Sequence, residues 1–140
     1  MKVLLAVDGS EDTKKMLAYL ATHEDLLGAS PTFFVLNVQP AVPGHAARVV
    51  GKEAVAEYQR SEAEKVLGPV GKFLTRQNVA YTSSHRSGHA ADEILRAAKK
   101  SKVDLIVMGS AGRRGISSLL LGSVTQSVLS GSDVPVMVMR

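Results

Sequence analysis

Short apolar runs alternate along the chain with segments whose apolar residues recur at helical spacing. The apolar runs have the length and β-branched content of strands, and they occupy residues 3–7, 32–38, 79–85, 103–108 and 134–139. Helical spacing occupies residues 11–27, 52–77, 90–101 and 123–130. The pattern predicts strands and helices in regular alternation, beginning and ending with a strand.

The strands are continuously apolar rather than alternating, which indicates burial on both faces. Strands of that kind form parallel sheets covered by helices, and right-handed crossovers make such sheets doubly wound. We therefore expect an α/β fold, Rossmann-like, with a doubly wound five-stranded parallel sheet in the order 3-2-1-4-5 and helices on both faces. A length of 140 residues is consistent with a single domain, 1–140.

Turn and cap residues predict where the helices begin and end. Ser10 is placed to cap the first helix, and Gly28 to stop it. Residues 40–44 contain two prolines and predict a loop before the second helical region. Within that region Pro69, preceded by a glycine, predicts either a kink or a break, and the sequence leaves both open.

Two segments far apart in the sequence meet in the predicted sheet. Strand one ends at Asp8, and Gly109 follows strand four. In the order 3-2-1-4-5 these two strands are neighbours at the topological switch point, where ligands bind beyond the carboxyl ends of the strands. We expect both residues to border one crevice.

A glycine-rich connection joins the fourth strand to the last helix. Gly109 and Gly112 begin it, and Gly122 and Ser123 end it at the start of the helix. Glycines let the backbone approach an anion, and the free amides of a helix N-terminus attract negative charge. Ser123 also forms a capping-box pattern with Gln126. The connection predicts a nucleotide-phosphate seat that is not a Walker A loop.

Composition narrows the classes of partner. The net charge is +4, but Lys and Arg are dispersed, and three Phe, three Tyr and no Trp offer few stacking surfaces. The composition therefore disfavours nucleic acid as a partner. The absence of cysteine fits a reducing cytoplasm, and no apolar run is long enough for a membrane span. His85 and His89 are four residues apart, but His85 ends a strand and Gly88 lies between them, so we expect no metal site.

The spacing Gly-two-Gly-nine-Gly-Ser resembles the nucleotide loop of the universal stress protein family. The opening Val-Asp-Gly-Ser at 7–10 and the closing Val-Pro-Val at 134–136 extend the resemblance over essentially the whole chain. It implies that this is a stress-response or regulatory protein that binds ATP, ADP or AMP, with or without Mg²⁺.

The resemblance also implies roles for individual residues. Asp8 would accept hydrogen bonds from ribose hydroxyls. Ala6, Val38 and Met108 would form the walls around adenine. The residues expected near ribose and phosphates are Gly109, Gly112, Arg113, Gly122, Ser123, Val124 and Thr125, with Arg114 as a further candidate.

The sequence also indicates how much catalysis to expect and how the chain assembles. The loop has no lysine at the P-loop position and no identifiable base, so we expect slow hydrolysis at most. The last strand, 134–139, is an apolar sheet edge blunted only by Pro135, which favours a homodimer through that strand. Two alternatives remain: an interaction module of the same fold that needs no nucleotide, and an enzyme acting on adenylated substrates.

Overall fold

The computed structural model describes residues 1–110 and 120–140. Its strands are β1 (Lys2–Ala6), β2 (Thr32–Gln39), β3 (Ala80–Ser87), β4 (Leu105–Gly109) and β5 (Val136–Met139). They form one parallel sheet in the order β3-β2-β1-β4-β5. The predicted fold class and strand order are confirmed.

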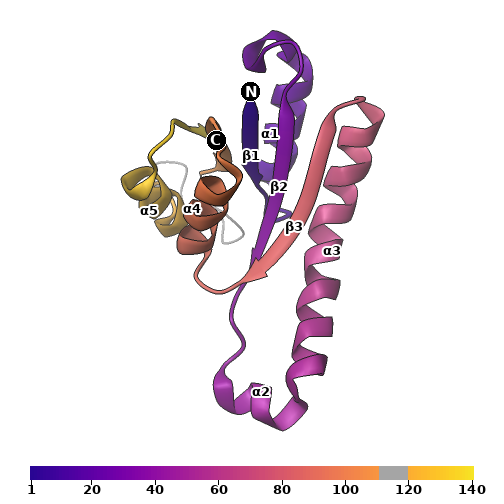
Figure 1. Ribbon diagram of the computed structural model, residues 1–140, viewed down its shortest axis with the longest axis vertical. Coiled ribbons are helices and arrows are strands. Elements are labelled where there is room, and N and C mark those ends of the chain that lie inside the picture. The colour runs from indigo at the N-terminus through magenta and orange to yellow at the C-terminus, as the bar shows by residue number, and fades with distance from the viewer. Residues whose placement is uncertain (111–119) are drawn as a thin grey trace.

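Helices lie on both faces of this sheet (Figure 1). The described helices are α1 (Glu11–Thr22), η1 (Glu24–Leu27, a 3-10 helix), α2 (Gly44–Val50), α3 (Lys52–Arg76), α4 (Ala90–Ser101) and α5 (Ser123–Gly131). Leu5 and Val35 face the core shared with α1 and α3, whereas Leu4 and Ile106 face the core shared with α4 and α5. Neighbouring residues of one strand thus serve two cores, which is why these strands are apolar throughout.

The strand β3 departs from the expectation of burial on both faces. It lies at the edge of the sheet, where β2 is its one neighbour among the described strands, and most of its residues are exposed. Tyr81 packs against the α1/α3 core, but every residue of the strand after it is polar. An edge strand with water beside it does not need a continuous apolar sequence.

The helical regions differ from the expectation in two places, and the structure excludes one of the two alternatives left open at Pro69. The first helix ends at Thr22; η1 follows it and ends at Leu27, with Gly28 as its C-cap residue at a φ of 84°, which suits glycine. The predicted loop before Lys52 contains a short helix, α2. It lies at the N-terminal end of α3, beyond the end of the sheet (Figure 1). The long helix α3 runs through Pro69 without a break. Apolar residues on either side of that proline, Val66 and Val70, are buried in the α1/α3 core and hold the helix together.

Among the described residues, no helix has both the length and the apolar character that crossing a membrane requires.

Candidate functional site

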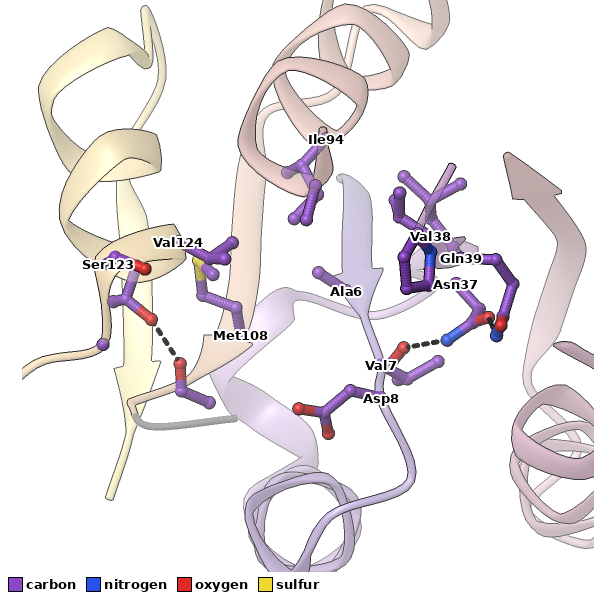
Figure 2. A pocket seen from close by; sticks show the side chains of 16 residues that line it. Ala6, Val7, Asp8, Asn37, Val38, Gln39, Ile94, Met108, Ser123 and Val124 are labelled. Atoms are coloured by element: carbon purple, nitrogen blue, oxygen red, sulfur yellow. Dashed lines mark hydrogen bonds between the residues drawn. The ribbon is translucent and has the colours of Figure 1, made fainter. Parts of the chain in front are cut away.

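A cavity of about 460 Å³ opens beyond the carboxyl ends of β1, β2 and β4. Its size is within the range of small-molecule sites. Figure 2 shows side chains from both halves of the chain around it. It is lined by Ala6, Val7, Asp8, Leu36, Asn37, Val38, Gln39, Pro40, Ala90, Ile94, Met108, Gly109, Gly122, Ser123, Val124 and Thr125.

The structure therefore gathers nine of the residues singled out in the sequence around one cavity. They are Ala6, Asp8, Val38, Met108, Gly109, Gly122, Ser123, Val124 and Thr125. The remaining candidates, Gly112, Arg113 and Arg114, lie outside the described residues. The switch-point argument thus placed the two distant segments correctly, because β1 and β4 are paired neighbours.

Asp8 follows β1 and is held by two donors from the chain just after it. Its Oδ1 accepts the backbone N–H of Ser10 at 2.9 Å and the hydroxyl of Thr13 at 3.1 Å. Ser10 is the N-cap residue as expected, but its hydroxyl makes no capping hydrogen bond. That oxygen is buried and has no partner among the described residues. The carboxylate of Asp8, rather than Ser10, therefore organises the turn into α1.

The start of α5 corrects the predicted capping box. The N-cap residue is Gly122 and Ser123 is the first helical residue, without a side-chain capping bond. Gln126 does not reach back to the cap amide; its side chain donates to the carbonyl of Leu121 at 2.8 Å. Ser123 is exposed and borders the cavity. The first turn of α5, which is the positive end of the helix dipole, therefore lies at the edge of that cavity.

Thr125 has a structural role that the sequence did not reveal. Its hydroxyl donates to the carbonyl of Gly109 at 2.9 Å and lies 3.3 Å from the carbonyl of Ser110. The residue is only 2% exposed. Thr125 thus joins α5 to the end of β4.

Gly109 has a packing reason to be glycine. A Cβ built on this residue would lie 2.6 Å from the Cβ of Asp12 in α1. Real Cβ atoms do not approach so closely, and Asp12 could not move away without shifting the start of α1. The exit of β4 is therefore in direct contact with the first turn of α1.

Apolar side chains form the opposing walls of the cavity. Ala6, Met108 and Val38 come from three adjacent strands, and Ile94 and Val124 approach from α4 and α5 (Figure 2). These walls can enclose a flat apolar or aromatic group. The contribution of α4 was not predicted, because an Ile at helical spacing resembles an ordinary core residue.

Two buried amides, also unpredicted, lie where β2 ends. Asn37 Nδ2 donates to the carbonyl of Val7 at 2.8 Å, and Gln39 Nε2 donates to Asn37 Oδ1 at 2.7 Å. Asn37 is 3% exposed and Gln39 8% exposed. Polar residues at the end of an apolar strand were the signal in the sequence that could have found them.

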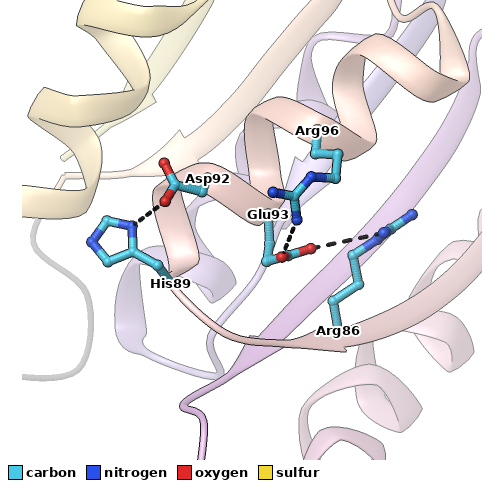
Figure 3. A network of polar contacts seen from close by, with 5 residues as sticks. All are labelled: Arg86, His89, Asp92, Glu93 and Arg96. Carbon is cyan, nitrogen blue, oxygen red and sulfur yellow. Dashed lines mark hydrogen bonds and ion pairs between the residues drawn. The ribbon is translucent and has the colours of Figure 1, made fainter.

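The first turn of α4 is fixed by charged side chains (Figure 3). The carboxylate of Glu93 binds Arg96 within the helix and lies 3.7 Å from Arg86 of β3, while His89 lies 3.3 Å from Asp92. Glu93 is the best shielded of these groups, with a side chain 13% exposed. This network holds α4 against β3, and α4 in turn supplies Ala90 and Ile94 to the cavity.

Comparison with solved structures supports the same architecture. Protein MJ0577 of Methanocaldococcus jannaschii has a TM-score of 0.78 and 25% identity, over 99% of this chain and 94% of that one. A universal stress protein of Archaeoglobus fulgidus, in complex with dAMP, has a TM-score of 0.66 at 20% identity, over 100% and 98% of the two chains. An Arabidopsis thaliana family protein with AMP bound has a TM-score of 0.68 at 18% identity, over 99% and 90%.

Sequence relatives cover the chain from end to end. A universal stress protein of Thermus aquaticus is 32% identical over 99% of this chain and 97% of its own length. The Bacillus subtilis universal stress protein YxiE is 31% identical over 99% and 98%. The model of the universal stress protein family matches residues 1–140. With its sheet order, its switch-point cavity and these matches, the chain belongs to the universal stress protein family.

Proposed function

We propose that the cavity binds an adenine nucleotide and that the protein acts as a nucleotide-responsive regulatory protein in a stress response. The observation that carries this proposal is the convergence of Asp8, Gly109 and Ser123 on one cavity, although they belong to three separate segments. A ribose acceptor, a close backbone approach and a helix N-terminus are the parts that a nucleotide requires.

The apolar walls suit the base. Ala6, Val38 and Met108 would bury the faces of adenine, and Ile94 would close the side toward α4. Burial of an aromatic ring against such walls removes apolar surface from water and supplies much of the affinity.

The polar end of the cavity suits the ribose and phosphates. Asp8 is already oriented by Ser10 and Thr13, so its carboxylate can accept ribose hydroxyls with little loss of side-chain freedom. The exposed first turn of α5 at Ser123 offers backbone amides to phosphate oxygens. The AMP and dAMP complexes of the Arabidopsis and Archaeoglobus proteins, which share this fold, support this proposal.

More specifically, we propose that the nucleotide is ATP, bound with or without Mg²⁺. Gly112 and Arg113 belong to the proposed phosphate seat on the family pattern alone. Among the described residues, those that line the cavity include no Lys and no His, and we propose slow hydrolysis at most. We also propose that the protein forms a homodimer through β5 and is located in the cytoplasm.

Isothermal titration calorimetry with ATP, ADP, AMP and GTP, with and without Mg²⁺, tests the proposal. We expect an adenine nucleotide to bind with a dissociation constant in the micromolar range, about −8 kcal/mol, and GTP to bind more weakly. Ser123→Ala should weaken ATP several-fold, whereas Ser127→Ala, one turn along the same helix and away from the cavity, should not. Absence of heat with every adenine nucleotide would contradict the proposal.

The alternative is a dimeric interaction module that works without nucleotide. Native mass spectrometry of freshly purified protein separates the two functions. A mass increment of an adenine nucleotide supports the first, and a dimer of bare chains together with silent titrations supports the second.

A further inference from the structure

We propose that Asp12 is a positioning residue for the phosphate end of the site, acting through Ser110; this inference rests on the proposed function. Asp12 is in the first turn of α1, and it is not among the residues that line the cavity. Its effect on a ligand would therefore be transmitted by the residues that it holds in place.

Asp12 holds the residue that follows β4. Its Oδ2 accepts the backbone N–H of Ser110 at 3.0 Å and lies 3.2 Å from the Ser110 hydroxyl, across 98 positions of sequence. Ser110 is 8% exposed, so little water is available to replace these hydrogen bonds. A hydrogen bond to a charged acceptor in such surroundings is stronger than one between neutral groups.

Ser110 passes this constraint to the start of α5. Its carbonyl oxygen accepts the backbone N–H of Gly122 at 2.7 Å and is 3.3 Å from the hydroxyl of Thr125. Gly122 is the N-cap residue of α5 and borders the cavity. Two consecutive contacts, Asp12 to Ser110 and Ser110 to Gly122, therefore link the first turn of α1 to the helix end where phosphates would bind.

The neighbouring carboxylate provides a contrast. Glu11 is also in the first turn of α1, but it pairs with Lys14 at 3.1 Å and both side chains are more than 70% exposed (77% and 73%). Both carboxylates lie in the first turn of α1, where their negative charge interacts favourably with the positive end of the helix dipole. A helix-dipole role would thus be common to both residues, whereas the contact with Ser110 distinguishes Asp12.

The test compares ATP with adenosine in Asp12→Ala, Asp12→Asn and Glu11→Ala. Adenosine contains the base and ribose but no phosphate, so it reports the rest of the site. In Asp12→Ala we expect ATP to bind about tenfold more weakly, as for loss of one charge-assisted hydrogen bond, and adenosine to be unchanged within about twofold. Asp12→Asn retains an acceptor oxygen and should restore most of the ATP affinity, and Glu11→Ala should match the wild type.

Backbone amide hydrogen exchange in the ligand-free protein gives a second measurement. Asp12→Ala should accelerate exchange at Ser110 and Gly122, and Glu11→Ala should not. If Asp12→Ala does not fold, Ser110→Ala removes only the hydroxyl contact and should weaken ATP selectively, by a smaller factor.

The outcomes separate the two proposals. A wild-type protein that binds no adenine nucleotide overturns the proposed function. Wild-type binding together with unchanged ATP affinity in Asp12→Ala, or with equal loss of ATP and adenosine, overturns the role of Asp12 alone.

Discussion

The side-chain amide of Asn37 donates a 2.8 Å hydrogen bond to the carbonyl oxygen of Val7, and so joins the ends of β2 and β1. Val7 immediately precedes Asp8, the acidic residue of the cavity. Gln39 donates to the oxygen of the same amide at 2.7 Å, which fixes its orientation. A buried polar pair thus determines where the chain leaves β1 to present Asp8.

Asn37→Asp tests this pair. The carboxylate can still accept from Gln39 but cannot donate to Val7, so we expect the free energy of unfolding at pH 7 to fall by about 1–3 kcal/mol. Burial raises the pKa of an Asp at this position, and its protonated form can donate again. Stability should therefore be regained as the pH is lowered and lost as the pH rises through the raised pKa. Urea unfolding at pH 5 and pH 7.5 measures this, with exposed Asn78→Asp as the control.

Asp8→Asn tests the ribose contact with little disturbance of the fold. The amide oxygen can still accept from Ser10 and Thr13, while the charge is lost. We expect AMP affinity to fall about tenfold or more, because hydrogen bonds to charged groups are worth about 1.5–3 kcal/mol. In the wild type, AMP should bind more tightly than 2′,3′-dideoxy-AMP, and in Asp8→Asn this preference should shrink. Equal binding of the two nucleotides by the wild type, measured by calorimetry, would refute the contact.

Gly71 and Tyr81 provide a test of packing away from the cavity. A Cβ on Gly71 would lie 2.8 Å from the Tyr81 hydroxyl oxygen but 3.4 Å from the ring carbon that carries it. Gly71→Ala alone should destabilise the protein by about 1–3 kcal/mol through overpacking. In the Tyr81→Phe background the same change should stabilise it by about 0.5–1 kcal/mol, because alanine is the better helix residue. A double-mutant cycle by urea unfolding measures the effect of Gly71→Ala on the free energy of unfolding in both backgrounds. If the effect has the same sign in both, the Tyr81 hydroxyl is not the obstacle.

Pro69 lies inside α3 with an exposed side chain. Proline in a helix interior costs about 3 kcal/mol relative to alanine, partly offset by the stiffer unfolded chain. We therefore expect Pro69→Ala to raise the free energy of unfolding by about 1–2 kcal/mol and leave the helical circular dichroism signal intact. A loss of stability in thermal or urea unfolding would mean that the proline ring supplies packing that alanine lacks.

Strand β5 is the apolar edge proposed to pair with its copy. It pairs with β4 on one side, and its four residues are half-buried. Val138→Lys should convert a dimer to a monomer in sedimentation velocity at micromolar concentration, because a charge at the centre of a small interface is not compensated. Val49→Lys, on α2 at a residue 85% exposed, is the matched control and should leave the dimer intact. A wild-type monomer would contradict the dimer directly.

The order of elements and the location of the cavity follow from local patterns in the sequence. Buried parallel strands require apolar side chains on both faces, so 3–7, 32–38 and 103–108 were recognisable as strands. Right-handed crossovers then leave few ways to order them, and the convergence of Asp8 with Gly109 follows from that order. Chain connectivity and strand hydrophobicity are sufficient for this level of prediction.

Contacts between distant residues were decided only by the tertiary structure. The continuity of α3 through Pro69 depends on burial of its apolar side, and the position of Ser110 depends on Asp12, 98 residues earlier. Thr125 resembled a ligand residue in the sequence, yet its hydroxyl binds the carbonyl of Gly109. Periodicity assigns a residue to an element and a face, but the partner of a buried polar group is determined when the elements pack, because water is then no longer available to satisfy it.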